Sequence, residues 1–151
     1  MNIRDLVSGL KDVLKNSTAI TDYCMNNFAK HQTVIVGMDS KESPKVDKMP
    51  CFIVFIIISD RTTEQLTYNI SIGISIEDNT IITNELNYEE YSGFIHVIQL
   101  KELIETELYK KYGKILFKST NIPNDVFPVF SAEVNAILPV PISKRSCREP
   151  L

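Results

Sequence analysis

The chain has 151 residues, 44% of them hydrophobic and 23% charged, and its formal net charge is −3. A chain of this length fits one domain and can bury roughly two-thirds of the surface that its unfolded form exposes. The small acidic excess argues against a dedicated nucleic-acid binder, because such proteins usually carry a strong basic excess.

The amino-terminal segment predicts two amphipathic helices. Residues 3–14 carry apolar side chains at helical spacing, which places one apolar stripe on the first helix. Ser17 or Thr18 is expected to cap the second helix, because a side-chain oxygen at this position accepts a hydrogen bond from a free backbone amide. The inner face of this helix is expected to consist of Ile20, Tyr23, Cys24 and Phe28.

A short strand, a long loop and a very apolar strand are predicted next. The β-branched stretch TVIV from Thr33 ends at Gly37, which indicates a short strand. Residues 38–50 form a charged loop with two prolines, and its length is typical of functional or disordered loops. Residues 51–58 are eight apolar residues in a row, far short of the ~20 that cross a bilayer as a helix. We therefore expect no membrane contact here but a strand covered on both faces.

Residues 66–76 alternate strictly between apolar and polar side chains. Leucine, tyrosine and isoleucine occupy the even positions, whereas threonine, asparagine, serine and glycine occupy the odd ones. This period of two predicts a strand with one buried and one polar face. A short polar turn separates it from the preceding apolar run, so we expect an antiparallel hairpin. The stretch NTIIT at residues 79–83 is expected to add a further short strand.

Residues 94–112 show the clearest helical pattern, with apolar side chains at helical spacing. Ser92 is expected to cap this helix, and Gly113 to close it. Lys110 and Lys111 suit the negative end of the helix dipole. Two strands complete the prediction, KILF at residues 114–117 and the alternating residues 128–140.

The predicted order is helix, helix, strand, strand, strand, helix, strand, strand. Because the strands cluster between flanking helices, we predict an α+β fold with a mainly antiparallel β-sheet packed against α-helices. We expect a single domain over residues 1–142, followed by a flexible carboxy-terminal tail, residues 143–151, that contains Cys147.

The sequence carries no motif that predicts catalysis or cofactor binding. Neither a G-x-x-x-x-G-K-[ST] loop nor a G-x-G-x-x-G turn occurs among the five glycines. The two histidines, His31 and His96, have no metal-ligand spacing, and the three cysteines are far apart with no C-x-x-C pair. We therefore expect no enzyme, metal or cofactor, and a reduced protein in which Cys24 and Cys51 are small core residues.

The block HQTVIVGMDSKESPKVDKMPCFIVF, residues 31–55, combines several features. A short strand ends in glycine, an aspartate and a polar loop with proline follow, and a second proline directly precedes the very apolar strand. Two amphipathic helices lie upstream. In these features the chain resembles the small tail-terminator and tail-completion proteins of long-tailed bacteriophages. The resemblance covers the first half to two-thirds of the chain, and the carboxy-terminal VPISKRSCREPL departs from it.

The resemblance implies an α+β fold and a structural role in the virion. Proteins of this family form rings, commonly hexameric, on the head-proximal end of the tail tube, where they stop tube growth and join the neck. The implied partners are further copies of the chain, the tail tube protein and a head-completion or neck protein, with assembly in the host cytoplasm. The loop that reaches neighbouring subunits would carry the candidate interface residues Asp39, Lys41, Glu42, Lys45, Asp47 and Lys48.

An acidic stretch spans residues 77–107. It contains eight aspartate or glutamate residues, and Lys101 is its single lysine or arginine. We interpret it as a solvated acidic face. In a ring, this stretch would face a central channel, where negative walls would let DNA pass without binding.

Two other classes of function remain open. A small monomeric binding module, such as an inhibitor of a host protein, would differ from a ring protein in its native mass. A hydrolase or nuclease of unknown type would reveal itself in a metal-dependent activity screen.

Overall fold

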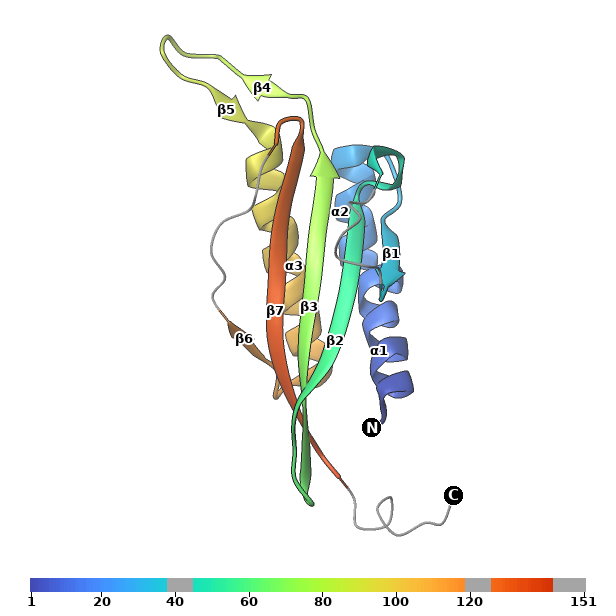
Figure 1. Cartoon of the computed structure of the whole chain (residues 1–151). Coiled ribbons are helices and arrows are strands. Elements are labelled where there is room, and N and C mark those ends of the chain that lie inside the picture. The colour runs from blue at the N-terminus through green and yellow to red at the C-terminus, as the bar shows by residue number, and fades with distance from the viewer. Residues whose placement is uncertain (38–44, 119–125, 143–151) are drawn as a thin grey trace.

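The computed structural model describes residues 1–37, 45–118 and 126–142. It has two layers, a five-stranded sheet and a layer of helices that all lie on the same face of that sheet (Figure 1). The described helices are α1 (Ile3–Asn16), α2 (Thr18–Phe28) and α3 (Ser92–Tyr112). The strands of the sheet, in spatial order, are β1 (Thr33–Val36), β2 (Cys51–Arg61), β3 (Gln65–Glu77), β7 (Val129–Pro141) and β6 (Leu116–Lys118).

The sheet is mainly antiparallel, so the predicted α+β fold is confirmed. β3 pairs antiparallel with β2 on one side and with β7 on the other, and β6 pairs antiparallel with β7. β1 is parallel to β2, a pairing that requires a long connection between the strands. The predicted hairpin of two long strands is therefore present, and KILF contributes to an edge strand.

The core lies between the helices and the even-numbered side chains of β3 and β7. Ile72 stands opposite Val54 on β2 and Val134 on β7, and all three side chains are buried. The period-two pattern thus gave the correct inner face. The helices contribute one stripe each to the same core, which includes Leu6, Leu10, Leu14, Ile20, Cys24, Val97, Leu100, Ile104 and Leu108.

The helix boundaries agree with the sequence pattern except at the start of α3. The Ser17 side chain caps α2 by accepting a hydrogen bond from the backbone amide of Ile20, as predicted. The prediction for Ser92 is wrong, because Ser92 is the first residue of α3 and Tyr91 occupies the N-cap position without a side-chain cap. Gly113 closes the helix with a positive φ of 61°, a conformation in which glycine avoids the Cβ clash.

The prediction that residues 51–58 are covered on both faces is wrong for the second half of β2. Cys51, Phe52 and Val54 are buried, but the side chains of Phe55, Ile57 and Ile58 are 43%, 57% and 55% exposed. β1 ends level with Val54 and the helices cover a single face, so the later part of β2 leaves the region that other elements cover.

Residues 81–91 form a separate two-stranded hairpin, β4 (Ile81–Ile82) with β5 (Glu90–Tyr91), that projects from one end of the molecule (Figure 1). The short strand predicted in NTIIT is therefore confirmed as β4. No described helix is both long and apolar enough to cross a membrane. The predicted flexible tail, residues 143–151 with Cys147, lies outside the described residues.

Candidate protein interface

The sheet face opposite the helices is open, and it combines a polar centre with an apolar side. β3 and β7 contribute polar side chains, and the Ser71 hydroxyl donates a hydrogen bond to the Glu133 carboxylate across the two strands. β2 contributes Phe55 and Ile57. A shallow hollow of about 420 Å³ lies between them, and its lining includes these four side chains and Lys118 of β6.

The outer edge of β2 is the second feature of this surface. β1 pairs with β2 over four positions and stops at Val54, so no described strand pairs with the outer edge of β2 beyond that residue. Free backbone amides and carbonyls along an apolar strand offer a template that another strand can extend. We name the exposed part of β2, Phe55 to Arg61 with Ile57 and Ile58 at its centre, the open β2 segment.

Three of the six predicted interface residues are described, and they lie away from the open β2 segment. Lys45, Asp47 and Lys48 are exposed on or beside a short 3₁₀ turn, η1 (Val46–Lys48), just before β2 begins. The Lys30 ammonium donates a hydrogen bond to the carbonyl of Asp47 and ties this turn to the end of α2. The structure therefore places these charges at the start of β2, whereas the open β2 segment is its far half. The remaining candidates, Asp39, Lys41 and Glu42, lie outside the described residues.

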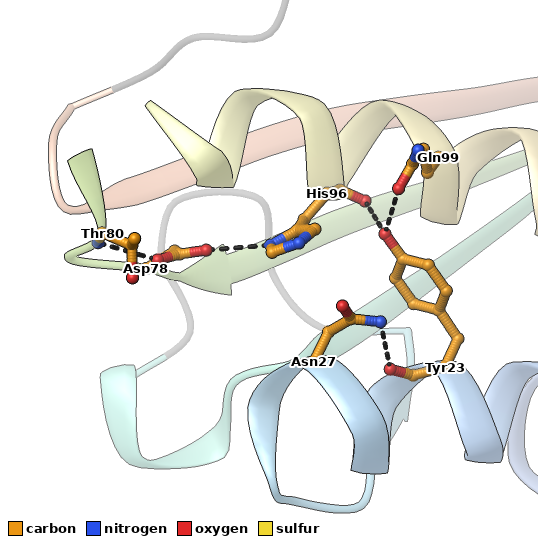
Figure 2. A network of polar contacts seen from close by, with 6 residues as sticks. All are labelled: Tyr23, Asn27, Asp78, Thr80, His96 and Gln99. Carbon is orange, nitrogen blue, oxygen red and sulfur yellow. Dashed lines mark hydrogen bonds and ion pairs between the residues drawn. The ribbon is translucent and has the colours of Figure 1, made fainter. Parts of the chain in front are cut away.

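A polar network joins the end of β3 to α3 and α2 (Figure 2). Asp78 directly follows β3, and its Oδ2 lies 2.9 Å from Nδ1 of His96 on α3. The other carboxylate oxygen accepts a hydrogen bond of 2.9 Å from the backbone amide of Thr80. The Tyr23 hydroxyl on α2 lies 2.9 Å from Oε1 of Gln99 and 3.2 Å from the His96 carbonyl. The network holds the chain that leaves β3 against both helices.

Sequence reasoning missed this network because its members come from three separate elements. Asp78 and His96 are 18 residues apart, and no short-range spacing marks them as partners. The rings of Phe28 and Tyr23 meet the His96 ring edge-to-face, with centroids 5.6 Å and 6.3 Å away. His96 is thus a partly buried histidine with a carboxylate partner, and its described contacts are those of a structural joint.

The described side chains show no arrangement for metal chemistry or thiol catalysis. No group of three or more His, Cys, Asp or Glu in the described ranges is placed to hold a metal ion. Cys24 and Cys51 are both buried, as predicted. Burial raises the pKa of the Cys24 thiol to about 12, so this thiol stays protonated at neutral pH and lacks the thiolate that a nucleophile requires.

The raised pKa of Cys24 predicts a loss of stability at alkaline pH. The folded state retains a proton that the unfolded state releases above about pH 9, so the free energy of unfolding is unaffected below that pH and falls above it, up to the folded pKa of about 12. One such group contributes a slope of up to about 1.4 kcal/mol per pH unit. Burial also raises the pKa of Tyr23 and Tyr112 to about 12, which steepens the loss above pH 10.

Urea unfolding between pH 7 and pH 10.5 measures this slope, with Cys24→Ala as the matched variant. We expect the variant to lose less stability than the wild type between pH 9 and pH 10.5, although it is less stable at pH 7. Parallel curves for the two proteins would contradict the assignment of the effect to Cys24.

Neither the family models nor the curated proteins supply a relative from which a function can be transferred. No family model matches this sequence, and no curated protein matches it. The candidate interface therefore depends on the geometry of the open face and the open β2 segment, and on the pattern of residues 31–55.

Proposed function

We propose that this protein is a structural subunit that assembles with further copies of itself into a ring, and that the ring is the tail terminator of a long-tailed bacteriophage. The observation that carries the assembly is the open β2 segment, which combines a strand edge with exposed apolar side chains, Phe55 and Ile57 on the open face and Ile58 on the opposite face. The phage assignment is supported by the pattern of residues 31–55 and by the α+β layout with two leading helices.

The energetics favour a covered β2 segment. Complete burial of an isoleucine or phenylalanine side chain stabilises by about 1.5–3 kcal/mol. Native monomers usually protect such edges with charges, proline or a bulge. β2 has a bulge at the end of this segment, between Ile58 and Asp60, but the strand before it is regular and apolar. A neighbouring subunit would cover the strand edge and the apolar side chains of the open β2 segment, which are exposed in the isolated chain.

In the proposed ring, the tail tube protein binds one side and a head-completion or neck protein binds the other. The ring ends tube polymerisation at the head-proximal end of the tail and joins the tail to the neck, with DNA passing through its lumen. Six copies is the number that the resemblance favours. The surfaces around Lys45, Asp47 and Lys48 remain candidates for contacts with these partners.

The decisive experiment measures the mass of the purified full chain in solution and images it by negative stain, alone and mixed with phage tail tubes. We expect a ring mass, annular particles, and tubes capped at one end. A protein that stays monomeric at high concentration and leaves tubes uncapped would rule out the ring and favour the small monomeric binding module.

Replacement of Ile57 by aspartate tests the open β2 segment within this proposal. Because Ile57 is more than half exposed, we expect the variant to unfold at nearly the same urea concentration as the wild type, within about 0.5 kcal/mol. Its assembly should weaken at least about tenfold, since a charge in a covered apolar contact costs more than 1.4 kcal/mol. Sedimentation velocity across a dilution series measures the change.

The matched control is Ile95→Asp, which places the same charge at an exposed isoleucine on the first turn of α3. This turn packs on Phe130, opposite Ile76, at the other end of the sheet from the open β2 segment. This control should retain wild-type assembly. Equal assembly by both variants would exclude the open β2 segment from the subunit interface.

A further inference from the structure

The hairpin at the end of the molecule is an arm with an apolar tip. We define the arm as residues 79–91, which comprise β4, β5 and the loop between them. Its loop carries Leu86, which is 93% exposed, and Tyr88, which is 42% exposed. Figure 1 shows the arm extending past the end of the sheet, away from the helices. Leu86 and Tyr88 together give the tip of the arm an apolar surface that another molecule can cover.

The base of the arm is held firmly. The Asp78 amide donates to the Pro128 carbonyl at 2.9 Å, and the Ser92 amide donates to the Thr80 carbonyl at 3.1 Å. The Asp78 carboxylate is itself paired with His96. On the other strand, the ring of Tyr91 packs against that of Phe127 at a centroid distance of 5.4 Å. A hairpin fixed at its base loses little freedom on binding, which favours a docking role.

The arm and the opposite end of α3 carry complementary charges. The arm contains Glu85, Glu89 and Glu90, and no lysine or arginine occurs anywhere in residues 62–100. At the far end, Lys114 just before β6 and Lys118 at the end of β6 are exposed and form no ion pair with any residue in the described ranges. Leu116 lies on the same face of β6 as Lys118 and is 63% exposed. We name Lys114, Leu116 and Lys118 the basic end.

The arm cannot reach the basic end of its own chain. α3 has 21 residues and separates the two by about 30 Å, since an α-helix rises about 1.5 Å per residue. The tip at Leu86 is four residues beyond β4, a reach of about 13 Å at about 3.3 Å per residue, and it points away from the body (Figure 1). Any contact between arm and basic end must therefore join two molecules.

We propose that the arm of one copy docks on the basic end of the next copy. This inference rests on the proposed ring and names a contact that builds it. The contact joins two different surfaces of the chain, as a head-to-tail ring requires. Leu86 and Tyr88 would pack against Leu116, while the arm carboxylates beside Lys114 and Lys118 would set register and orientation more than they add affinity.

Reciprocal charge reversal tests this contact with the full chain. The arm variant is Glu85→Lys with Glu89→Lys, and the basic-end variant is Lys114→Glu with Lys118→Glu. Each variant alone brings like charges together, so we expect its assembly to weaken at least about tenfold in sedimentation velocity. An equimolar mixture should assemble again, because the reversed arm meets the reversed basic end and the two native surfaces meet each other. The mixed particle should contain equal numbers of both variants by native mass spectrometry.

The control is Asp22→Lys with Glu102→Lys. It changes the net charge by the same amount as the arm variant, at exposed positions on α2 and α3. It should assemble as the wild type does. If the wild type forms rings but the two variants keep wild-type assembly, or their mixture is no better than either alone, the arm contact is overturned while the ring stands. A monomeric wild type would instead overturn the ring and this contact with it.

Discussion

Replacement of Ile72 by aspartate is expected to abolish the cooperative fold. Ile72 lies on the central strand β3 with no exposed surface, between Val54 and Val134. An unpaired carboxylate buried there costs several kcal/mol, a large share of the 5–15 kcal/mol that stabilise a typical domain. Circular dichroism and urea unfolding should show a protein without a cooperative transition. The conservative change Ile72→Val should cost only about 0.5–1.5 kcal/mol.

The matched control is Asn69→Asp, which adds the same charge on the opposite face of the same strand. Asn69 lies between Ile57 and Ile137 on the open face, where the carboxylate stays in contact with water. Ser71 is the less suitable control, because its hydroxyl donates a hydrogen bond to the Glu133 carboxylate. An aspartate at this position would lose that bond and place two carboxylates next to each other. Similar unfolding curves for the two aspartate variants would show that the inner face of β3 is assigned wrongly.

Replacement of Gly93 by alanine is expected to destabilise the domain, although alanine normally favours a helix by up to about 1 kcal/mol over glycine. A Cβ atom at Gly93 would lie 2.2 Å from Cδ2 and 2.4 Å from Cε2 of Phe130. The Phe130 ring cannot move aside easily, because it is buried and packs edge-to-face on Phe127. Overpacking of this kind costs about 1–3 kcal/mol, so the clash outweighs the helix propensity.

Thermal unfolding measures this effect as a fall in Tm of several degrees, since about 1 kcal/mol corresponds to about 2–4 °C in a domain of this size. Gly73→Ala is the control. Its Cβ would meet nothing nearer than the Ile53 carbonyl oxygen at 3.9 Å, so its Tm should stay the same or rise slightly. A Gly93→Ala protein as stable as the control would mean that α3 and β7 are less closely packed at this point.

The candidate site was harder to predict than the fold. The charges at Lys45, Asp47 and Lys48 are exposed as expected, but they lie at the start of β2 rather than beside its open half. The Asp78–His96 pair had no sequence signal, because its partners come together only when α3 packs back on the end of β3. Of the arm, the sequence predicted one short strand at residues 79–83 within an acidic stretch, and it gave no sign of the projecting hairpin.

Local periodicity determined the elements and their inner faces. The strict alternation of residues 66–76 assigned the buried face of β3, and the helical spacing of residues 94–112 assigned most of the buried stripe of α3. These predictions succeeded because the face on which a side chain lies depends only on the backbone geometry of its own element. Phe94, at the start of that pattern, is the exception, since it is 45% exposed.

Tertiary structure alone decided which apolar surfaces are covered. The run from Cys51 to Ile58 is equally apolar at both ends, yet Phe52 is buried and Ile57 is not. Coverage depends on where β1 stops and on the single face that the helices occupy, and these are properties of other segments of the chain. The same holds for the arm and the basic end, whose charges lie at opposite ends of the molecule because α3 runs the length between them. An apolar or charged run in the sequence marks side chains that are stabilised by being covered or paired. The packing of distant elements decides whether the chain itself or another molecule covers or pairs them.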